Sequence, residues 1–189
     1  MERDLLVRLD DLVMAVIHLV RNRTLTRIMI AITDLGSPFI LVPGTVLLAA
    51  FLMFRRRIPD AVFVTAAMIM GGILNTIVKN AIQRARPFPP PGGPLVEAGG
   101  WSYPSGHALL STLFYFTLAY IAGRLAGREY LRLPIAVAAL LISGLISLSR
   151  VYLGVHYPSD ILAGMTGGIL LFAICLTAMH FYEVREKRR

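Results

Sequence analysis

The chain has 189 residues, enough for one domain, and 56% of them are hydrophobic while only 16% are charged. Soluble chains carry about a quarter charged residues, so this composition and the mean hydropathy of +0.67 indicate a membrane protein. The net charge is +8 and the pI is about 10.2. Because the arginines lie between apolar segments and not along one polar face, the charge argues against nucleic-acid binding and favours anionic lipid headgroups as partners.

Residues 1–24 are predicted to form an amphipathic helix. Leu5, Leu9, Leu12 and Val16 recur at helical spacing, and charged residues interrupt them. Two interpretations stay open: the helix lies at the membrane interface, or it is a sixth span whose polar face is covered by the other helices. The opening segment MERDLLVRLDD is charged throughout, which is not typical of a secretory signal peptide.

Five segments downstream have the ~20 mostly apolar residues that a membrane-spanning helix needs. They lie at about residues 35–54, 60–78, 107–122, 133–148 and 159–181. The predicted fold is therefore an all-α integral membrane bundle of five to six transmembrane helices, in a single domain of residues 1–189. Residues 87–106, between the second and third spans, hold many prolines and glycines, which exclude a regular helix.

The basic residues predict the orientation of this bundle. Most of them lie in loops that share one side of the alternating topology: Arg55, Arg56, Arg57, Arg124, Arg128, Arg132, Arg185, Lys187, Arg188 and Arg189. The positive-inside rule makes this side cytoplasmic. We therefore expect the loop of residues 87–106 to face outward, towards a periplasm or the exterior.

A second group of polar residues lies where the second and fourth spans end and the third and fifth begin. Because the spans alternate in direction, these four points reach the same membrane surface. The residues are Lys79, Arg86, Ser105, Gly106, His107, Arg150, His156 and Asp160. Two histidines, one aspartate and three cations at one surface of an apolar chain indicate a functional site.

The cations of this group suit a phosphate. The planar fork of Arg86 and of Arg150 can bind two oxygens at once, and Lys79 adds a third positive charge. Ser105 is a predicted N-cap and Gly106 allows close backbone approach, so the start of the third span offers free N–H groups to an anion. Three fixed cations can supply the charge that magnesium supplies elsewhere, so we expect no metal and no other cofactor.

The histidines indicate phosphoryl transfer. His156 and Asp160 are four residues apart, so they share a face if the segment is helical. Asp160 then accepts from one ring nitrogen of His156 and leaves the other free as a nucleophile. His107 supplies a second imidazole, which protonates the leaving oxygen and then activates water. The residues thus predict hydrolysis through a phosphohistidine.

Three other interpretations of these residues stay open. His107, His156 and Asp160 also fit a metal site of two histidines and one carboxylate, although the nearby cations would repel a divalent ion. A phosphotransferase would pass the phosphoryl group of the same phosphohistidine to an alcohol instead of water. A non-enzymatic lipid-binding protein would carry the site in a degenerate form. The oligomeric state is not fixed by the sequence.

Three motifs resemble the signatures of the type 2 phosphatidic acid phosphatase family, membrane lipid phosphatases that share a core with vanadium haloperoxidases. They are KNAIQRARP (79–87), PSGH (104–107) and SRVYLGVHYPSD (149–160). All three are complete and in order, and the resemblance covers residues from about 60 to 180. It implies a metal-independent, vanadate-sensitive enzyme with a six-helix core, in which His156 is the nucleophile, Asp160 its partner and His107 the acid/base. It implies as phosphate-binding residues Lys79, Arg86, Ser105, Gly106 and Arg150.

The resemblance also implies a lipid phosphate or diphosphate as substrate. We expect a bacterial cytoplasmic (inner) membrane protein of the short type, with the active site facing the periplasm or exterior. Undecaprenyl diphosphate is our first expectation, because a short, outward-facing phosphatase suits recycling of a lipid carrier. Phosphatidylglycerol phosphate, phosphatidic acid and lipid A 1-phosphate stay open. We further expect residues 87–103 to act as a substrate lid.

Overall fold

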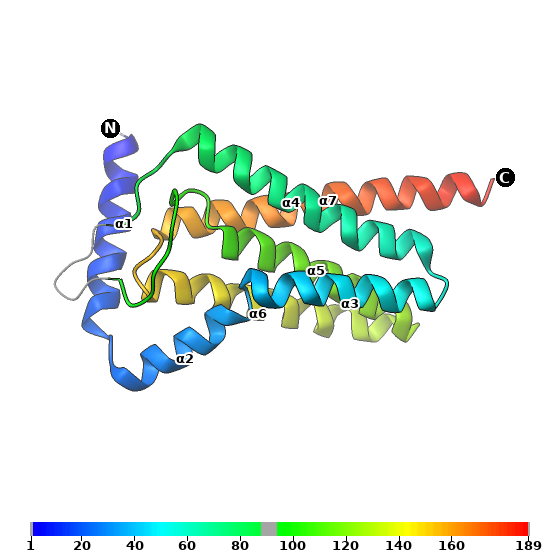
Figure 1. The fold of residues 1–189 in the computed structure, drawn as a ribbon, viewed down its shortest axis with the longest axis horizontal. Helices are drawn as coiled ribbons and strands as arrows, with labels where there is room; N and C mark the ends of the chain where they lie inside the picture. The colour runs from blue at the N-terminus through cyan, green and yellow to red at the C-terminus, as the bar shows by residue number, and fades with distance from the viewer. Residues whose placement is uncertain (1, 88–93, 189) are drawn as a thin grey trace.

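The computed structural model describes residues 2–87 and 94–188, and every regular element within them is a helix (Figure 1). The α-helices are α1 (Glu2–Leu19), α2 (Arg23–Asp34), α3 (Pro38–Phe54), α4 (Ile58–Ile82), α5 (Gly106–Ala126), α6 (Arg132–Tyr152) and α7 (Pro158–Glu186). A short 3-10 helix, η1 (Glu129–Leu131), precedes α6. The predicted all-α fold is confirmed, and part of the predicted loop, residues 88–93, lies outside the described residues.

Five segments of the described chain are long and apolar enough to cross a membrane. They are Arg23–Phe54, Ile58–Ile82, Gly106–Ala126, Glu129–Tyr152 and Pro158–Glu186. The five predicted spans are confirmed, and each extends beyond its predicted bounds. The first runs through both α2 and α3, which are separate helices because Ser37 takes an extended N-cap conformation and Pro38 begins a new first turn.

Helix α1 lies across one end of the bundle, beside the chain turns at that end (Figure 1). On its inner face Met14 packs in a cluster with Ala108, Val151 and Ile161. Its outer face exposes apolar side chains, among them Leu5, Leu9, Leu12 and Val16. An amphipathic helix in this position, with an apolar face left uncovered, fits the membrane interface better than a sixth span.

Close packing of α5 on α7 depends on two glycines of α7. A β-carbon at Gly164 would lie 2.7 Å from the carbonyl oxygen of Ser105, and one at Gly168 would lie 2.7 Å from that of Leu109. Small residues four apart on one face let two helix backbones approach closely. The first turns of α5 and α7 are therefore neighbours, and the Ser105 N–H donates to the carbonyl oxygen of Asp160 (3.0 Å).

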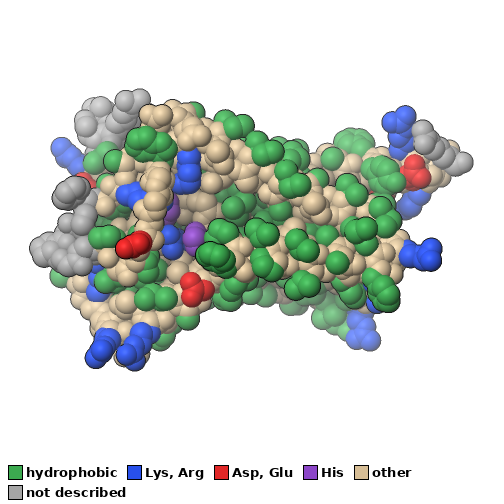
Figure 2. Space-filling model, viewed as in Figure 1, with side chains coloured by type: hydrophobic (Ala, Val, Ile, Leu, Met, Phe, Trp, Pro, Cys, Tyr) green, Lys and Arg blue, Asp and Glu red, His purple; other side chains and the backbone are tan. Residues whose placement is uncertain are grey.

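The helices alternate in direction, so the ends of α4 and α6 meet the starts of α5 and α7 beside α1 (Figure 1). We call this end of the bundle the site end. The end that holds η1 and the last turns of α7 is called the opposite end. Figure 2 shows hydrophobic side chains along the visible face of the bundle between them, with many lysine and arginine side chains near the two ends.

The interior changes character along the bundle. Between α3, α4, α5 and α7 the core is apolar, with fully buried side chains such as Leu52, Val64, Leu113 and Ile121. The site end instead buries polar side chains: Ser102, Ser105, Arg150, His156 and Asp160. Burying polar groups costs free energy unless they find partners, so hydrogen bonds and ion pairs determine the structure there.

Candidate active site

Two cations of the first motif hold the segment that follows α4. Lys79, near the end of α4, donates to the carbonyl oxygen of Trp101 (2.5 Å). Arg86 donates to the carbonyl oxygens of Gly99 (2.6 Å) and Gly100 (3.1 Å). Carbonyl groups fix the position of these side chains but leave their positive charge without a counter-charge.

The second motif forms the start of α5. Ser105 is the N-cap, as predicted, and its side-chain oxygen accepts a backbone N–H from the first turn (3.4 Å). A β-carbon on Gly106 would lie 3.3 Å from the amide group of Asn75, so the glycine allows α4 and α5 to come close. The ring of His107 points towards the α2–α3 junction, where a β-carbon on Gly36 would lie 3.4 Å from it.

Arg150, in the last turn of α6, is 6% exposed. Its Nη1 donates to the hydroxyl oxygen of Thr33 in α2 (2.9 Å). Within the described chain its buried Nε has no hydrogen-bond partner. Buried donors are nearly always paired in folded proteins. An unsatisfied guanidinium N–H at this place therefore indicates a position for an anion.

The hydrogen bonds of His156 identify its tautomer. Arg86 Nη1 lies 3.2 Å from His156 Nε2, and because a guanidinium can only donate, Nε2 accepts and carries the lone pair. Nδ1 then carries the proton and faces Ser102 Oγ at 3.3 Å and Asp160 Oδ2 at 3.5 Å. A nucleophilic histidine needs a free lone pair on one ring nitrogen. In this tautomer the lone pair is on Nε2, the nitrogen that faces Arg86.

The condition for placing His156 and Asp160 on one helical face, a helix that includes both residues, is not met. Helix α7 begins at Pro158 with Tyr157 as its N-cap, so His156 precedes the helix. Asp160 caps that helix by accepting from the Tyr157 N–H (2.9 Å). The two side chains are still neighbours, with His156 Nδ1 3.5 Å from Asp160 Oδ2. Ser102 contacts both, because its hydroxyl donates to Asp160 Oδ2 (2.5 Å) and lies 3.3 Å from His156 Nδ1.

Arg84 is a partner of Asp160 that is not among the predicted site residues. Its Nη1 lies 2.6 Å from Asp160 Oδ1 and its Nη2 lies 2.7 Å from Asp10 Oδ2. The guanidinium also stacks over the ring of Tyr157, 4.1 Å from its centroid. Asp10 is buried although α1 lies at the surface, and it accepts from the Ser159 N–H (2.9 Å). These contacts connect α1 to the aspartate beside His156.

One of these additional residues could have been noticed in the sequence. Arg84 is a third basic residue within KNAIQRARP, beyond the lysine and the Arg-Pro pair of the motif. Asp10 could not, because it stands beside Asp11 among the several charged residues of the first helix. Ser102 could not either, because a serine in a loop is ordinary.

Burial and neighbouring charges shift the pKa values of His156 and Arg84, which both lie outside the membrane-spanning segments. Burial, together with the positive charges of Arg86 and Arg150, lowers the pKa of His156 to about 4, although its contact with Asp160 opposes this shift. Burial also works against the charge of Arg84, but the carboxylates of Asp10 and Asp160 raise its pKa overall. At neutral pH the imidazole of His156 is therefore neutral and Arg84 is charged.

The predicted phosphate-binding cations differ from Arg84 in their partners. Among the side chains that the structure describes, residues 5–87 and 94–188, no carboxylate lies within ion-pair distance of Lys79, Arg86 or Arg150. All three are close enough to act electrostatically on the ring of His107. The site end therefore has positive charge in excess around two imidazoles.

The alternative metal site is not assembled. Within the part of the chain that the structure describes, no three histidine, cysteine or acidic side chains lie close enough together to hold a metal ion. His107 and Asp160 instead have separate surroundings, the first near the α2–α3 junction and the second enclosed by Arg84, Ser102 and the start of α7.

The described part of the predicted lid is packed against the site. The Leu95 N–H donates to the carbonyl oxygen of Leu153 (3.0 Å), and the Ser102 N–H donates to that of Arg84 (2.8 Å). Leu95 and its neighbour Val96 also pack against Tyr152 and Leu153 at the end of α6. Residues 94–102 thus form a fixed wall of the site, and the remaining part of the predicted lid, residues 88–93, lies outside the described residues.

Comparisons with known proteins agree with this arrangement. A family model described as the PAP2 superfamily matches residues 60–183. Phosphatidylglycerophosphatase B of Bacillus subtilis (strain 168) is 33% identical over 165 residues, which are 86% of this chain and 79% of that protein. An undecaprenyl-diphosphatase of Sulfolobus acidocaldarius is 28% identical over 151 residues, 75% of this chain and 64% of that protein.

A solved structure extends the likeness to the fold. The crystal structure of a transmembrane PAP2-type phosphatidylglycerolphosphate phosphatase from Bacillus subtilis is 31% identical, with a TM-score of 0.84 over 90% of this chain and 84% of that chain. The resemblance seen in the three motifs is confirmed, and so is an integral membrane protein with this fold. The chain therefore belongs to the PAP2 superfamily and is a hydrolase acting on phosphoric esters.

Proposed function

We propose that this protein removes phosphate from a lipid phosphate monoester or diphosphate through a phosphohistidine at His156. The observation that carries the proposal is the excess of positive charge around a neutral, buried imidazole. Lys79, Arg86 and Arg150 have no carboxylate partner among the described residues, and the lone pair of His156 Nε2 faces Arg86. A bound phosphate would supply the counter-charge and place phosphorus beside that lone pair.

In the first step His156 Nε2 attacks phosphorus while the bond from phosphorus to the leaving oxygen breaks. His107 donates a proton to that oxygen, so the lipid alcohol or lipid phosphate leaves as a neutral or less charged group. Lys79, Arg86 and Arg150 stabilise the negative charge on the equatorial oxygens. Asp160, held by Arg84 and Ser102, stabilises the positive charge that His156 gains.

In the second step water replaces the histidine. His107, now neutral, takes a proton from the water as its oxygen attacks phosphorus. The bond between phosphorus and Nε2 breaks, inorganic phosphate leaves and His156 regains its lone pair. No metal takes part in this scheme, because side-chain cations provide the charge stabilisation. Ser105 and Gly106 add backbone N–H groups at the start of α5.

The membrane setting supports a lipid substrate. The site end lies where four spans turn, beside an amphipathic helix, so a headgroup can enter while its chains stay in the bilayer. The excess of arginine and lysine at the opposite end supports an orientation in which the site faces the periplasm or exterior of a bacterial cytoplasmic membrane. Similarity to phosphatidylglycerophosphatase B makes phosphatidylglycerol phosphate a first substrate to test, beside our sequence-based choice, undecaprenyl diphosphate.

The test is phosphate release by the purified full-length protein in detergent, with EDTA present throughout. The panel holds phosphatidylglycerol phosphate, undecaprenyl diphosphate, phosphatidic acid and a lipid A 1-phosphate. A rapid acid-free quench with a radiolabelled substrate then looks for phosphate attached to protein. We expect release from one lipid class, unaffected by EDTA, and an acid-labile phosphoprotein that is absent in His156→Ala.

Each other outcome contradicts a stated part of the proposal. Loss of activity in EDTA, restored by a divalent ion, would contradict the metal-independent scheme. A phosphoprotein that persists in His156→Ala would move the nucleophile to another residue. Transfer of label to an added alcohol in preference to water would replace hydrolysis by the phosphotransferase alternative.

A further inference from the structure

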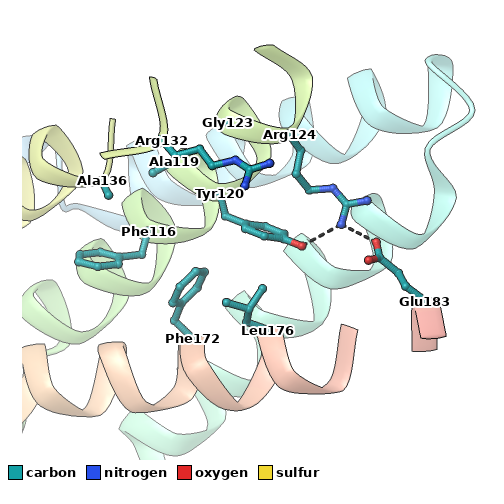
Figure 3. Close-up of a pocket in the computed structure, with 10 residues that line it drawn as sticks. All are labelled: Phe116, Ala119, Tyr120, Gly123, Arg124, Arg132, Ala136, Phe172, Leu176 and Glu183. Atoms are coloured by element: carbon teal, nitrogen blue, oxygen red, sulfur yellow. Dashed lines mark hydrogen bonds and ion pairs between the residues drawn. The ribbon is translucent and has the colours of Figure 1, made fainter. Parts of the chain in front are cut away.

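A cavity of about 510 Å³ lies near the opposite end of the bundle, away from the candidate active site (Figure 3). Residues of α5, α6 and α7 line it, and none of them belongs to the site described above. Its volume lies within the range of about 300–1,000 Å³ that is common for small-molecule sites. The reaction proposed for the site end gives this cavity no role.

The inner part of the cavity is apolar. Figure 3 shows the rings of Phe116 from α5 and Phe172 from α7, with Leu176 beside Phe172 and Ala136 from α6 above Phe116 in this view. All four residues belong to membrane-spanning segments. A cavity with such walls, inside the bilayer region of the protein, suits a hydrocarbon chain.

The outer part of the cavity carries two arginines. Figure 3 shows Arg124 and Arg132 on the same side of the cavity, with Tyr120 and Glu183 near Arg124. Arg124 Nη1 donates to Tyr120 Oη (2.8 Å) and to Glu183 Oε1 (2.5 Å). The charge of Glu183 is therefore already paired, and it does not repel an anion as a free carboxylate would.

The arginines keep donors for a further partner. The contacts of Arg124 with Tyr120, Glu183 and Asp60 use its Nη1 and Nε, so among the described residues its Nη2 donors stay available. Arg132 is 61% exposed, and its ion pair with Glu129 at 3.3 Å involves a glutamate that is 86% exposed. An exposed pair of this kind is weak and yields readily to a better anion.

The surroundings of the cavity are electropositive as well. In the described chain, basic side chains at this end outnumber acidic ones: Arg55, Arg56, Arg57, Arg124, Arg128, Arg132, Arg185, Lys187 and Arg188 against Asp60, Glu129, Glu183 and Glu186. Clusters of arginine and lysine beside membrane-spanning helices attract anionic lipids. Both the rim and its neighbourhood thus favour a negatively charged headgroup over a zwitterionic one.

We propose that this cavity binds one anionic phospholipid of the leaflet opposite the active site. One acyl chain lies against Phe116, Phe172 and Leu176, and the phosphate of the headgroup binds Arg132 and the free donors of Arg124. The lipid fills the space between α5, α6 and α7 and so stabilises the bundle without taking part in the reaction. The proposal does not depend on the function proposed for the site end.

The test measures thermal unfolding of the full-length protein in detergent with added phosphatidylglycerol, phosphatidylcholine or inorganic phosphate. We expect inorganic phosphate, which the site end is proposed to bind, to act equally on the unmodified protein and on Arg132→Gln, and phosphatidylcholine to have little effect. We expect phosphatidylglycerol to raise the Tm by roughly 5 °C, because it binds the folded state only. In Arg132→Gln we expect at least half of this rise to be lost. Arg128→Gln is the matched control, since Arg128 is an exposed arginine of the same loop that contacts Tyr130 and does not line the cavity.

A second variant tests the apolar part. Ala136→Phe fills the cavity, so we expect it to abolish the phosphatidylglycerol response while phosphate release at the other end of the protein continues, which shows that the variant folds. An equal response of Arg132→Gln and Arg128→Gln would overturn the headgroup assignment. Equal stabilisation by phosphatidylcholine, or a rise with inorganic phosphate that Arg132→Gln removes, would overturn the choice of an anionic phospholipid. An undiminished response in Ala136→Phe would overturn the cavity as the place of binding.

Discussion

The two ends of the bundle each bury an aspartate in the first turns of a spanning helix, but they treat the surrounding arginines differently. At the opposite end Asp60 lies 2.6 Å from Arg57, and Arg124 connects it to Glu183. Every arginine of that network faces a carboxylate. Such paired charges hold α4, α5 and α7 together and leave little net charge among the paired groups themselves.

At the site end the cations of the three motifs are used differently. Arg84 pairs with Asp10 and Asp160, while Lys79, Arg86 and Arg150 bind carbonyl and hydroxyl groups. Neutral partners position a cation but do not compensate it, which costs stability in the empty protein. The comparison shows that the number of arginines does not distinguish a structural cluster from a candidate active site, whereas the nature of their partners does.

Removal of a histidine at each end should give the largest contrast. We expect His156→Ala to lower kcat by roughly 10⁴-fold or more, because it removes the nucleophile and leaves only the binding groups. His180→Ala, an exposed histidine near the opposite end of α7, should keep its kcat within about twofold, as expected for a surface substitution. Initial rates on one lipid substrate measure both, and full activity of His156→Ala would remove the proposed mechanism.

The two buried aspartates should separate activity from stability. We expect Asp160→Asn to lower kcat by roughly 10³-fold, because an amide no longer stabilises the charged imidazole. Asp60→Asn should instead lower the free energy of unfolding by roughly 2–3 kcal/mol, since it leaves Arg57 and Arg124 partly unpaired, and should keep kcat per folded molecule.

Rate measurements and thermal unfolding on the same preparations check this pair of predictions. A loss of kcat in Asp60→Asn at a temperature where the protein stays folded would contradict the assignment of that network to stability. An unchanged kcat in Asp160→Asn would show that the contact between His156 and Asp160 has no part in the reaction.

Substitutions of Arg84 test whether the paired cation of the site end has a different role from the three phosphate-binding cations. We expect Arg84→Met to lower kcat by about 10- to 100-fold with little change in KM, because Asp160 loses one of its fixed positions while the phosphate-binding cations remain. Arg84→Lys should recover part of kcat, since it restores the charge without the fork. A rise in KM with constant kcat would instead make Arg84 a substrate-binding residue.

The smallest expected effect is in the pH dependence. Burial lowers the pKa of His156 to about 4, so the neutral, nucleophilic form persists as the pH falls from 7 to 5. As the pH falls, kcat/KM decreases when the nucleophile becomes protonated. The midpoint of this decrease should therefore lie well below the ordinary histidine pKa of about 6.5.

The variant Arg86→Gln tests the direction in which the acid limb of the pH profile should shift. Arg86→Gln removes a positive charge that lowers the pKa of His156, so its acid limb should move to higher pH, in addition to the general loss of activity. A wild-type limb near 6.5, or a shift to lower pH in Arg86→Gln, would contradict the neutral resting state of the nucleophile. Profiles of kcat/KM between pH 4 and 8 distinguish these outcomes.

The sequence by itself determined the spans, the family and the common surface of the three motifs. Each of these follows from local features: apolar segments of membrane length, residues at fixed spacing, and the alternation that any set of spanning helices must obey. Lys79, His107, Arg150 and His156 come together at the site end because each stands next to the end of a span. No long-range contact had to be known for that prediction.

The tertiary structure alone decided which groups pair. Asp10 and Arg84 are 74 positions apart, and Arg84 and Asp160 are 76 apart, so no periodicity relates them. It also decided that α1 lies across the bundle, that Ser102 contacts both His156 and Asp160, and that His156 precedes its helix. These features depend on how helices pack and on the backbone of a loop, which local patterns do not encode. The charge balance that distinguishes the two ends is therefore a property of the packed molecule.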